Sequence, residues 1–191
     1  MTAPTIKTEN LILRPFQPDD AEAYYETVLS NETVMQALPS GRPVPQQRTP
    51  GIIRGYIDQW EEHGYGLWAV ILQATGQMIG HCGLQPLDQK SAIELTYAFE
   101  PGSASGDLPI EAVRACLRYA FETLLMMEVV AVILPQNEGA RRVYSRVGMS
   151  PRGDVHAYNQ HLPYYTFYQG DFIVDKSPYH ILGGLDDPPS D

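Results

Sequence analysis

The chain has 191 residues, of which 43% are hydrophobic and 19% are charged, a composition typical of a folded globular domain and not of a disordered chain. Its formal net charge is −10 at pH 7, which argues against a nucleic-acid partner or an anionic membrane, because both require a basic surface. The sequence contains no run of about 18 apolar residues, so no membrane span is expected. Residues 1–10 lack the apolar core of a signal peptide, and we therefore expect a cytoplasmic protein.

The cysteines, histidines and prolines of the sequence indicate whether a disulfide or a metal site is expected and where the folded domain ends. Cys82 and Cys116 lie far apart in the sequence, a pattern that fits a reduced thiol pair better than a disulfide and does not exclude one. The five histidines are scattered without a metal-binding spacing, so no metal is expected. Residues 176–191 are rich in proline and aspartate, so we expect one domain over residues 1–175 and a flexible acidic, proline-rich tail over residues 176–191.

The first third of the chain predicts one strand and two helices. Residues 6–16 read as a strand, which Pro18 ends. Pro18 and the two acidic residues after it open a helix, since negative charge in the first turn suits the helix dipole. Thr49 is the expected N-cap of the second helix, with Pro50 at its first position and Gly64 at its end.

The rest of the chain predicts a mixed sheet. The expected strands and helices, in order, are strands 67–72, 77–84 and 92–99, helix 108–124, strand 129–134, helix 138–147 and strands 154–158 and 164–174. Gly148 fits the position just after a helix end. Antiparallel strands followed by a strand–helix–strand unit predict an α+β fold.

Several local sequences, in this order and spacing, carry a resemblance to a known family. They are residues 8–16 (TENLILRPF), 64–70 (GYGLWAV), 79–84 (IGHCGL), 94–97 (ELTY) and the block 135–149. Over residues 5–172 the chain resembles the GNAT acyltransferases, especially the RimJ/RimL-like ribosomal-protein N-terminal alanine acetyltransferases. The resemblance implies the GNAT acyl-CoA N-acyltransferase fold, with a mixed, mostly antiparallel sheet whose central strands splay apart between flanking helices.

The resemblance also implies that acetyl-CoA is the cosubstrate. Its pantetheine arm would lie between strands 92–99 and 129–134, bonded to exposed backbone as an added strand would be. The residues expected along the arm are Thr96, Tyr97, Ala98 and Phe99. Asn137 resembles the family asparagine that contacts the arm, and it equally fits an N-cap of the helix that follows.

Two residues match catalytic positions of the family. Tyr144 matches the residue that often gives a proton to the departing thiolate, and a phenol with a pKa of about 10 keeps that proton at neutral pH. Its alternative role is packing on the sheet. Glu94 resembles the general base for the acceptor amine, a task that needs a raised pKa or a water chain, and its alternative is a solvent-facing strand position. Other base candidates, expected to be structural or surface residues, are His81, His156 and His161.

The pyrophosphate loop departs from the family pattern. The resemblance places this loop at Ser105, Gly106, Asp107, Leu108 and Pro109. Asp107 replaces a glycine, and an aspartate at a helix start can cap the backbone amides and repel an anion. Pro109 removes one amide donor. We therefore expect weakened CoA binding, with Gly106, one residue early, as a partial compensation.

Three functions remain open at this point, and for the third, an acyltransferase with another acyl donor, the sequence gives no positive sign. The first is an N-acetyltransferase acting on a primary amine, either a small molecule or a protein N-terminus. The second is a GNAT-fold pseudoenzyme that serves as a binding or regulatory module with weak or no CoA binding. Four aromatic residues are open to interpretation as an acceptor pocket, as core or as a homodimer face: Tyr158, His161, Tyr164 and Tyr165.

Overall fold

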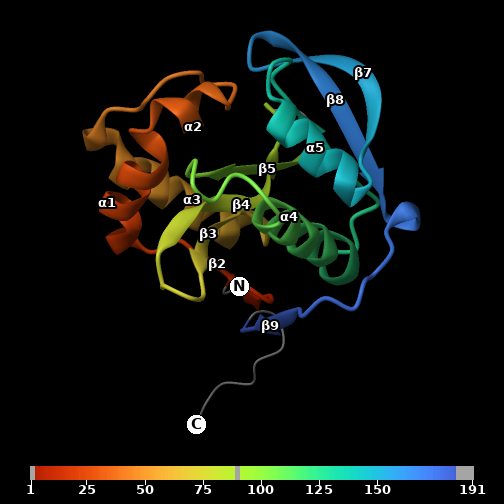
Figure 1. Cartoon of the computed structure of the whole chain (residues 1–191), viewed down its shortest axis with the longest axis horizontal. Helices are drawn as coiled ribbons and strands as arrows, with labels where there is room; N and C mark the ends of the chain where they lie inside the picture. The colour runs from red at the N-terminus through yellow and green to blue at the C-terminus, as the bar shows by residue number, and fades with distance from the viewer. Residues whose placement is uncertain (1–2, 89–90, 184–191) are drawn as a thin grey trace.

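The computed structural model describes residues 3–88 and 91–183, and in this part of the chain nine strands form one mixed sheet (Figure 1). The strands are β1 Thr5–Lys7, β2 Leu11–Pro15, β3 Leu67–Leu72, β4 Met78–Pro86, β5 Ile93–Phe99, β6 Glu128–Val132, β7 Ser150–Ala157, β8 Gln160–Tyr168 and β9 His180–Leu182. Their order across the sheet is β7-β8-β6-β5-β4-β3-β2-β1-β9.

The centre of the sheet opens between β5 and β6. These two strands are parallel and share one register position, Glu94 opposite Val130, whereas the neighbouring pairs are antiparallel and share several. Beyond this position the carboxyl-terminal halves of the two strands are no longer paired with each other. The expected splay of the central strands is confirmed.

Helices cover both faces of the sheet, with α1, α2 and α3 on one side and α4 and α5 on the other (Figure 1). The α-helices are α1 Ala21–Tyr24, α2 Glu32–Gln36, α3 Thr49–His63, α4 Leu108–Arg118 and α5 Glu138–Val147. Two π-helical turns, Tyr25–Leu29 and Tyr119–Thr123, extend α1 and α4. Three short 3₁₀ turns complete the helical elements: Pro18–Asp20, Gln46–Arg48 and Gln169–Asp171.

Strand β3 is apolar on both faces because each face lies under a helical layer. Leu67 and Ala69 join the core cluster of α1–α3, and the alternate residues Trp68 and Val70 join the cluster that contains α4 and α5. The continuous apolar sequence of β3 is thus the signature of a central strand that is covered on both faces.

The next strand, β4, requires glycine at position 80, where φ is +149° and a Cβ atom would lie 1.9 Å from the carbonyl oxygen of Ala98.

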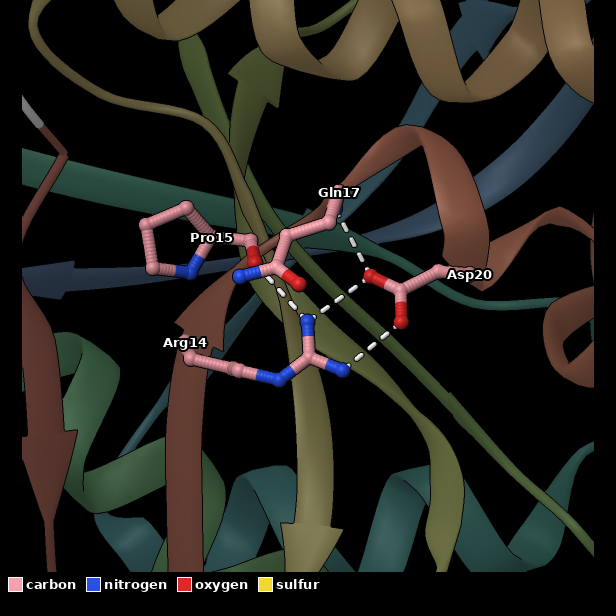
Figure 2. Close-up of polar contacts among 4 residues, drawn as sticks. All are labelled: Arg14, Pro15, Gln17 and Asp20. Atoms are coloured by element: carbon pink, nitrogen blue, oxygen red, sulfur yellow. Dashed lines mark hydrogen bonds and ion pairs between the residues drawn. The ribbon is translucent and has the colours of Figure 1, made fainter.

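A partly buried ion pair fixes the chain where β2 leads into the first helical layer (Figure 2). The guanidinium of Arg14 donates to both carboxylate oxygens of Asp20 at 2.7 Å, and it also donates to the carbonyl oxygen of Pro15. The same carboxylate accepts from the backbone N–H of Gln17 at 2.7 Å. Asp20 therefore both caps the turn and ties it to the strand, which explains why this acidic residue follows Pro18.

The structure corrects several boundaries. The expected strand 6–16 is divided into β1 and β2 by a turn closed by a hydrogen bond from Thr8 N to Leu11 O. Thr49 is not the N-cap of α3, because the 3₁₀ turn before it runs directly into the helix and makes Arg48 the cap residue. Helix α2 was not expected at all. By contrast, Gly64 and Gly148 end their helices in the left-handed conformation, as predicted.

The segment predicted as a flexible tail contains an edge strand. Within residues 176–191, strand β9 pairs antiparallel with β1, so that Ile181 lies opposite Ile6. Figure 1 shows the chain after β8 passing around the molecule to reach β9 beside the N-terminus. The prediction of a flexible tail from residue 176 is therefore wrong for His180–Leu182. Residues 184–191 of the predicted tail lie outside the described residues.

Candidate active site

Glu94 lies on β5 at the position where β5 and β6 begin to separate. Its side chain is buried, with 3% of the residue exposed, so the alternative of a solvent-facing position is wrong. Its Oε2 atom accepts hydrogen bonds from Gln85 Nε2 at 3.0 Å and from the Tyr158 hydroxyl at 2.5 Å. These donors come from β4 and from the turn between β7 and β8, so three distant parts of the chain meet at this carboxyl group.

The pKa of Glu94 is raised above the ordinary value for glutamate. Burial is the largest cause, and the nearby charge of Asp88 adds to it. The hydrogen bonds from Gln85, Tyr158 and the backbone of Val132 act in the opposite direction. A buried carboxyl group with a raised pKa is suited to accept a proton from an ammonium group.

Tyr144 projects from α5 onto the carboxyl-terminal half of β5. It is 3% exposed, and its hydroxyl donates to the carbonyl oxygen of Leu95 at 3.2 Å, one residue beyond Glu94. Burial raises the pKa of Tyr144 well above its ordinary value, with smaller contributions from Tyr97 and Glu94. The residue therefore packs on the sheet, and its hydroxyl at the same time keeps a proton beside the diverging strands.

The four residues expected along the cofactor arm occupy the part of β5 that has left β6. Leu95, Tyr97 and Phe99 pack on the side of α4 and α5, and Ala98 packs on the side of α1–α3. Thr96 is two residues before Ala98 on the strand, so its side chain lies on the same face as that of Ala98. The ring of Tyr97 stands 5.8 Å, centroid to centroid, from those of Phe99 and Tyr144.

Asn137 is the N-cap of α5. Its side-chain oxygen accepts from the N–H of Ala140 at 3.0 Å, and its amide nitrogen donates to the carbonyl oxygen of Ala37 at 3.2 Å. The capping role is confirmed. The second bond ties α5 to the loop after α2, across the end of the open strands.

The loop at the start of α4 differs from expectation at Asp107. This residue has helical backbone angles, φ −98° and ψ −12°, whereas a capping side chain requires an extended backbone, and it makes no capping bond. Its exposed carboxylate instead accepts from Arg146 Nη1 at 2.9 Å, which links the start of α4 to the end of α5. The expectation that Asp107 occupies the first amides of α4 is therefore wrong. Pro109 lies in the first turn, where it removes one donor as predicted.

Two arginines of α5 that the sequence analysis did not single out lie near this loop. Arg142 and Arg146 are one helical turn apart on α5, so they share a face. Arg146 reaches the loop through Asp107, and Arg142 lies close enough to Tyr97 to oppose the rise that burial causes in the pKa of that phenol. The signal in the sequence is two basic residues four apart on a helix that Asn137 begins.

The other base candidates do not join this site as bases. Burial lowers the pKa of His81 to about 4, and its ring bonds to the Tyr24 hydroxyl at 2.9 Å, which marks it as a structural residue. His156 and His161 face each other on the exposed side of the β7–β8 hairpin. Of the four aromatic residues left open, Tyr165 is core, and Tyr158 is the one that contacts Glu94.

A cavity of about 840 Å³ lies elsewhere, between α4, the β1–β2 turn and residues 171–179. Asp107 and Arg146 border it, but neither Glu94 nor Tyr144 does. Among residues 3–88 and 91–183, no group of three or more His, Cys, Asp or Glu side chains is placed to hold a metal ion. No helix in the same part of the chain has the length and apolar character needed to cross a membrane.

Comparisons with known proteins agree with this geometry. The sequence profile of the Acetyltransferase (GNAT) domain family matches residues 10–150. YoaA, an uncharacterized N-acetyltransferase of Bacillus subtilis (strain 168), is 25% identical over 180 residues, which are 94% of this chain and 97% of that protein. YkkB, an uncharacterized protein of the same organism, is 30% identical over 112 residues, which are 56% of this chain and 65%, just under two thirds, of that protein.

Solved structures show the same fold. An acetyltransferase from Agrobacterium tumefaciens str. C58 superposes with a TM-score of 0.72 at 27% identity, covering 88% of this chain and 96% of that one. RimJ of Mycobacterium smegmatis, solved in complex with CoA-disulfide, superposes with a TM-score of 0.74 at 16% identity, covering 87% and 90%. The expected likeness to the RimJ/RimL group holds at the level of the fold. With its diverging central strands and the family profile over most of its length, the chain belongs to the GNAT acetyltransferase family.

Proposed function

We propose that this protein is an N-acetyltransferase that moves an acetyl group from acetyl-CoA to a primary amine of a small molecule or a protein N-terminus. The observation that carries the proposal is the buried Glu94 carboxyl group at the point where β5 leaves β6. A carboxylate is costly to bury, and its hydrogen-bonded position beside the open strands gives it a chemical use. Membership of the family supports acetyl transfer in general.

The residues present fit acetyl-CoA at both ends of the opening. The β5 backbone from Thr96 to Phe99 is available to a pantetheine arm, because its strand pairing with β6 ends at Glu94. The first amides of α4 are not capped by Asp107, and the helix start is suited to a pyrophosphate. Arg142 and Arg146 add positive charge on the neighbouring helix, and RimJ, of the same fold, is solved with CoA-disulfide bound.

The mechanism divides two proton transfers between two residues. The thioester of acetyl-CoA supplies the acetyl group. Glu94 takes a proton from the acceptor ammonium, which frees the nitrogen lone pair to attack the thioester carbon. Tyr144, whose raised pKa keeps its hydroxyl protonated, gives a proton to the sulfur as the carbon–sulfur bond breaks.

The proposal is tested by release of free CoA thiol with a panel of primary amines and N-terminal peptides. We expect amine-dependent thiol release by the wild-type protein. In Glu94→Gln we expect kcat to fall by about 100-fold to 10,000-fold, while the affinity for acetyl-CoA stays within about twofold, because the residue acts on the acceptor. Folded protein that releases no thiol with any amine would contradict the proposal.

One observation favours the alternative of a pseudoenzyme that binds CoA weakly or not at all. Asp107 places a negative charge next to the start of α4 and engages Arg146, a cation that a phosphate would otherwise attract. Pro109 removes a further amide donor. A pseudoenzyme with these changes would keep the fold and its buried network but would not respond to acetyl-CoA.

A further inference from the structure

The side chains of Glu94, Gln85 and Tyr158 are joined by three hydrogen bonds. The Tyr158 hydroxyl and Gln85 Nε2 both donate to Oε2 of Glu94, at 2.5 Å and 3.0 Å. Gln85 Nε2 also donates to the Tyr158 hydroxyl oxygen at 3.1 Å. Both side-chain donors thus bond Oε2, and no side chain among residues 3–88 and 91–183 donates to the second oxygen, Oε1. The backbone of Val132 also contacts this carboxyl group and lowers its pKa.

The backbone of Tyr158 is held in a conformation that an aromatic residue rarely adopts. Its φ is +52° and that of Asn159 is +57°, so both central residues of the turn between Ala157 and Gln160 are left-handed. Two-residue hairpin turns of this type favour Asn-Gly or Asp-Gly, and a bulky residue persists only where its surroundings fix it. The N–H of Tyr158 donates to Asp88 Oδ2 at 2.7 Å, which anchors the turn on the connection between β4 and β5.

We propose that Tyr158 is a positioning residue for the general base: anchored by Asp88, it fixes Oε2 of Glu94 and leaves Oε1 to take the proton from the acceptor ammonium. This inference rests on the proposed function. In the step, an N–H bond of the ammonium breaks, an O–H bond forms at Oε1, and the nitrogen keeps the electron pair. Through this anchored turn, the β7–β8 hairpin, which is distant from Glu94 in the sequence, fixes the orientation of the Glu94 carboxyl group.

The groups around Glu94 support this direction of control. Burial and the neighbouring Glu94 raise the pKa of Tyr158, so its hydroxyl stays protonated and donates. That donation favours the charged carboxylate, whereas Asp88 opposes it by repulsion. From α5, the protonated Tyr144 hydroxyl is a further titratable neighbour, and it donates to the Leu95 carbonyl oxygen rather than to Glu94.

The test compares Tyr158→Phe with the wild-type protein. The variant keeps the ring and removes the donor, so we expect kcat to fall about tenfold, the KM for acetyl-CoA to stay unchanged and the acidic limb of kcat/KM to move up by about one pH unit. Asp88→Asn should move the limb in the opposite direction, because it removes a negative charge. Tyr168→Phe, on the exposed end of β8, is the matched control and should leave both parameters unchanged.

A second readout separates this inference from the proposed function. The carboxyl carbon of Glu94, assigned by its loss in Glu94→Gln, can be titrated by ¹³C NMR in protein that holds no substrate. We expect the Glu94 pKa to rise in Tyr158→Phe. An unchanged Glu94 titration in a variant of an active enzyme would overturn the positioning role alone. Absence of acetyl transfer by the wild-type protein would overturn the proposed function and this inference together.

Discussion

Burial raises the pKa of the Glu94 carboxyl group, and this shift links the charge of Glu94 to the stability of the fold. Because the folded-state pKa is higher than the unfolded-state pKa, the protonated form is favoured by folding. The contribution of this protonated carboxyl group to the free energy of unfolding is fully present below the ordinary pKa of glutamate, about 4.3. It is lost as the pH rises through the folded-state pKa. At neutral pH the protein therefore bears the cost of a buried negative charge.

Glu94→Gln removes that cost, since an amide stays neutral at every pH. We expect the difference in Tm between the variant and the wild-type protein to shift in favour of the variant as the pH rises from 4 to 8, measured by thermal unfolding. Glu61→Gln, at an exposed position of α3, should show no such trend. A Tm difference that stays constant across this pH range would contradict the raised pKa.

Residue-level features were the hardest to predict. The family resemblance pointed to Glu94 as a candidate base, but its burial and its hydrogen bonds were not predictable, because the tertiary fold brings Gln85 and Tyr158 to it. The side chain of Asp107 was expected to cap α4, and only the backbone angles show that it cannot. Asn137, by contrast, was predictable because a cap depends on residues three positions away.

At the scale of elements, the success of a prediction depended on how much local sequence an element carries. Helix α5 was predicted with its true bounds, because Asn137 and Gly148 supply a cap and a stop at its two ends. Strand β9 has three residues, all exposed, and gives no alternating pattern to detect. Its position is set by pairing with β1, at the other end of the sequence.

The C-terminal segment is expected to contribute to stability. The ring of Tyr179 lies 4.4 Å from the Arg118 guanidinium carbon, and β9 extends the sheet beside β1. Deleting residues 177–191 should lower stability by about 1–3 kcal/mol and Tm by roughly 2–10 °C, measured by thermal unfolding. Deleting residues 184–191 alone keeps these contacts and serves as the control. Equal Tm values for the two deletions would show that β9 and Tyr179 add nothing.

At the scale of the whole molecule, the sequence predicted the architecture and the family, and the chemistry of the site stays a prediction. The order of strands and helices, read from periodicity and turn residues, led to the mixed sheet. The divergence of β5 and β6 was implied by the resemblance to the GNAT family. The cavity beneath residues 171–179 was not expected, because it depends on the path of the C-terminal segment around the sheet. The family profile agrees with the architecture, while the acceptor amine belongs to the proposal.

The account depends on acetyl-CoA binding between β5 and β6, with its phosphates at the start of α4. Calorimetric titration of the wild-type protein should give one site per chain, with a dissociation constant between about 1 μM and 1 mM. Asp107→Asn should tighten binding by about twofold to fivefold at low salt, an effect limited by the exposure of the ion pair, and Asp58→Asn on α3 should not. Folded protein that gives no heat with acetyl-CoA, in the wild type and in Asp107→Asn alike, would contradict the account.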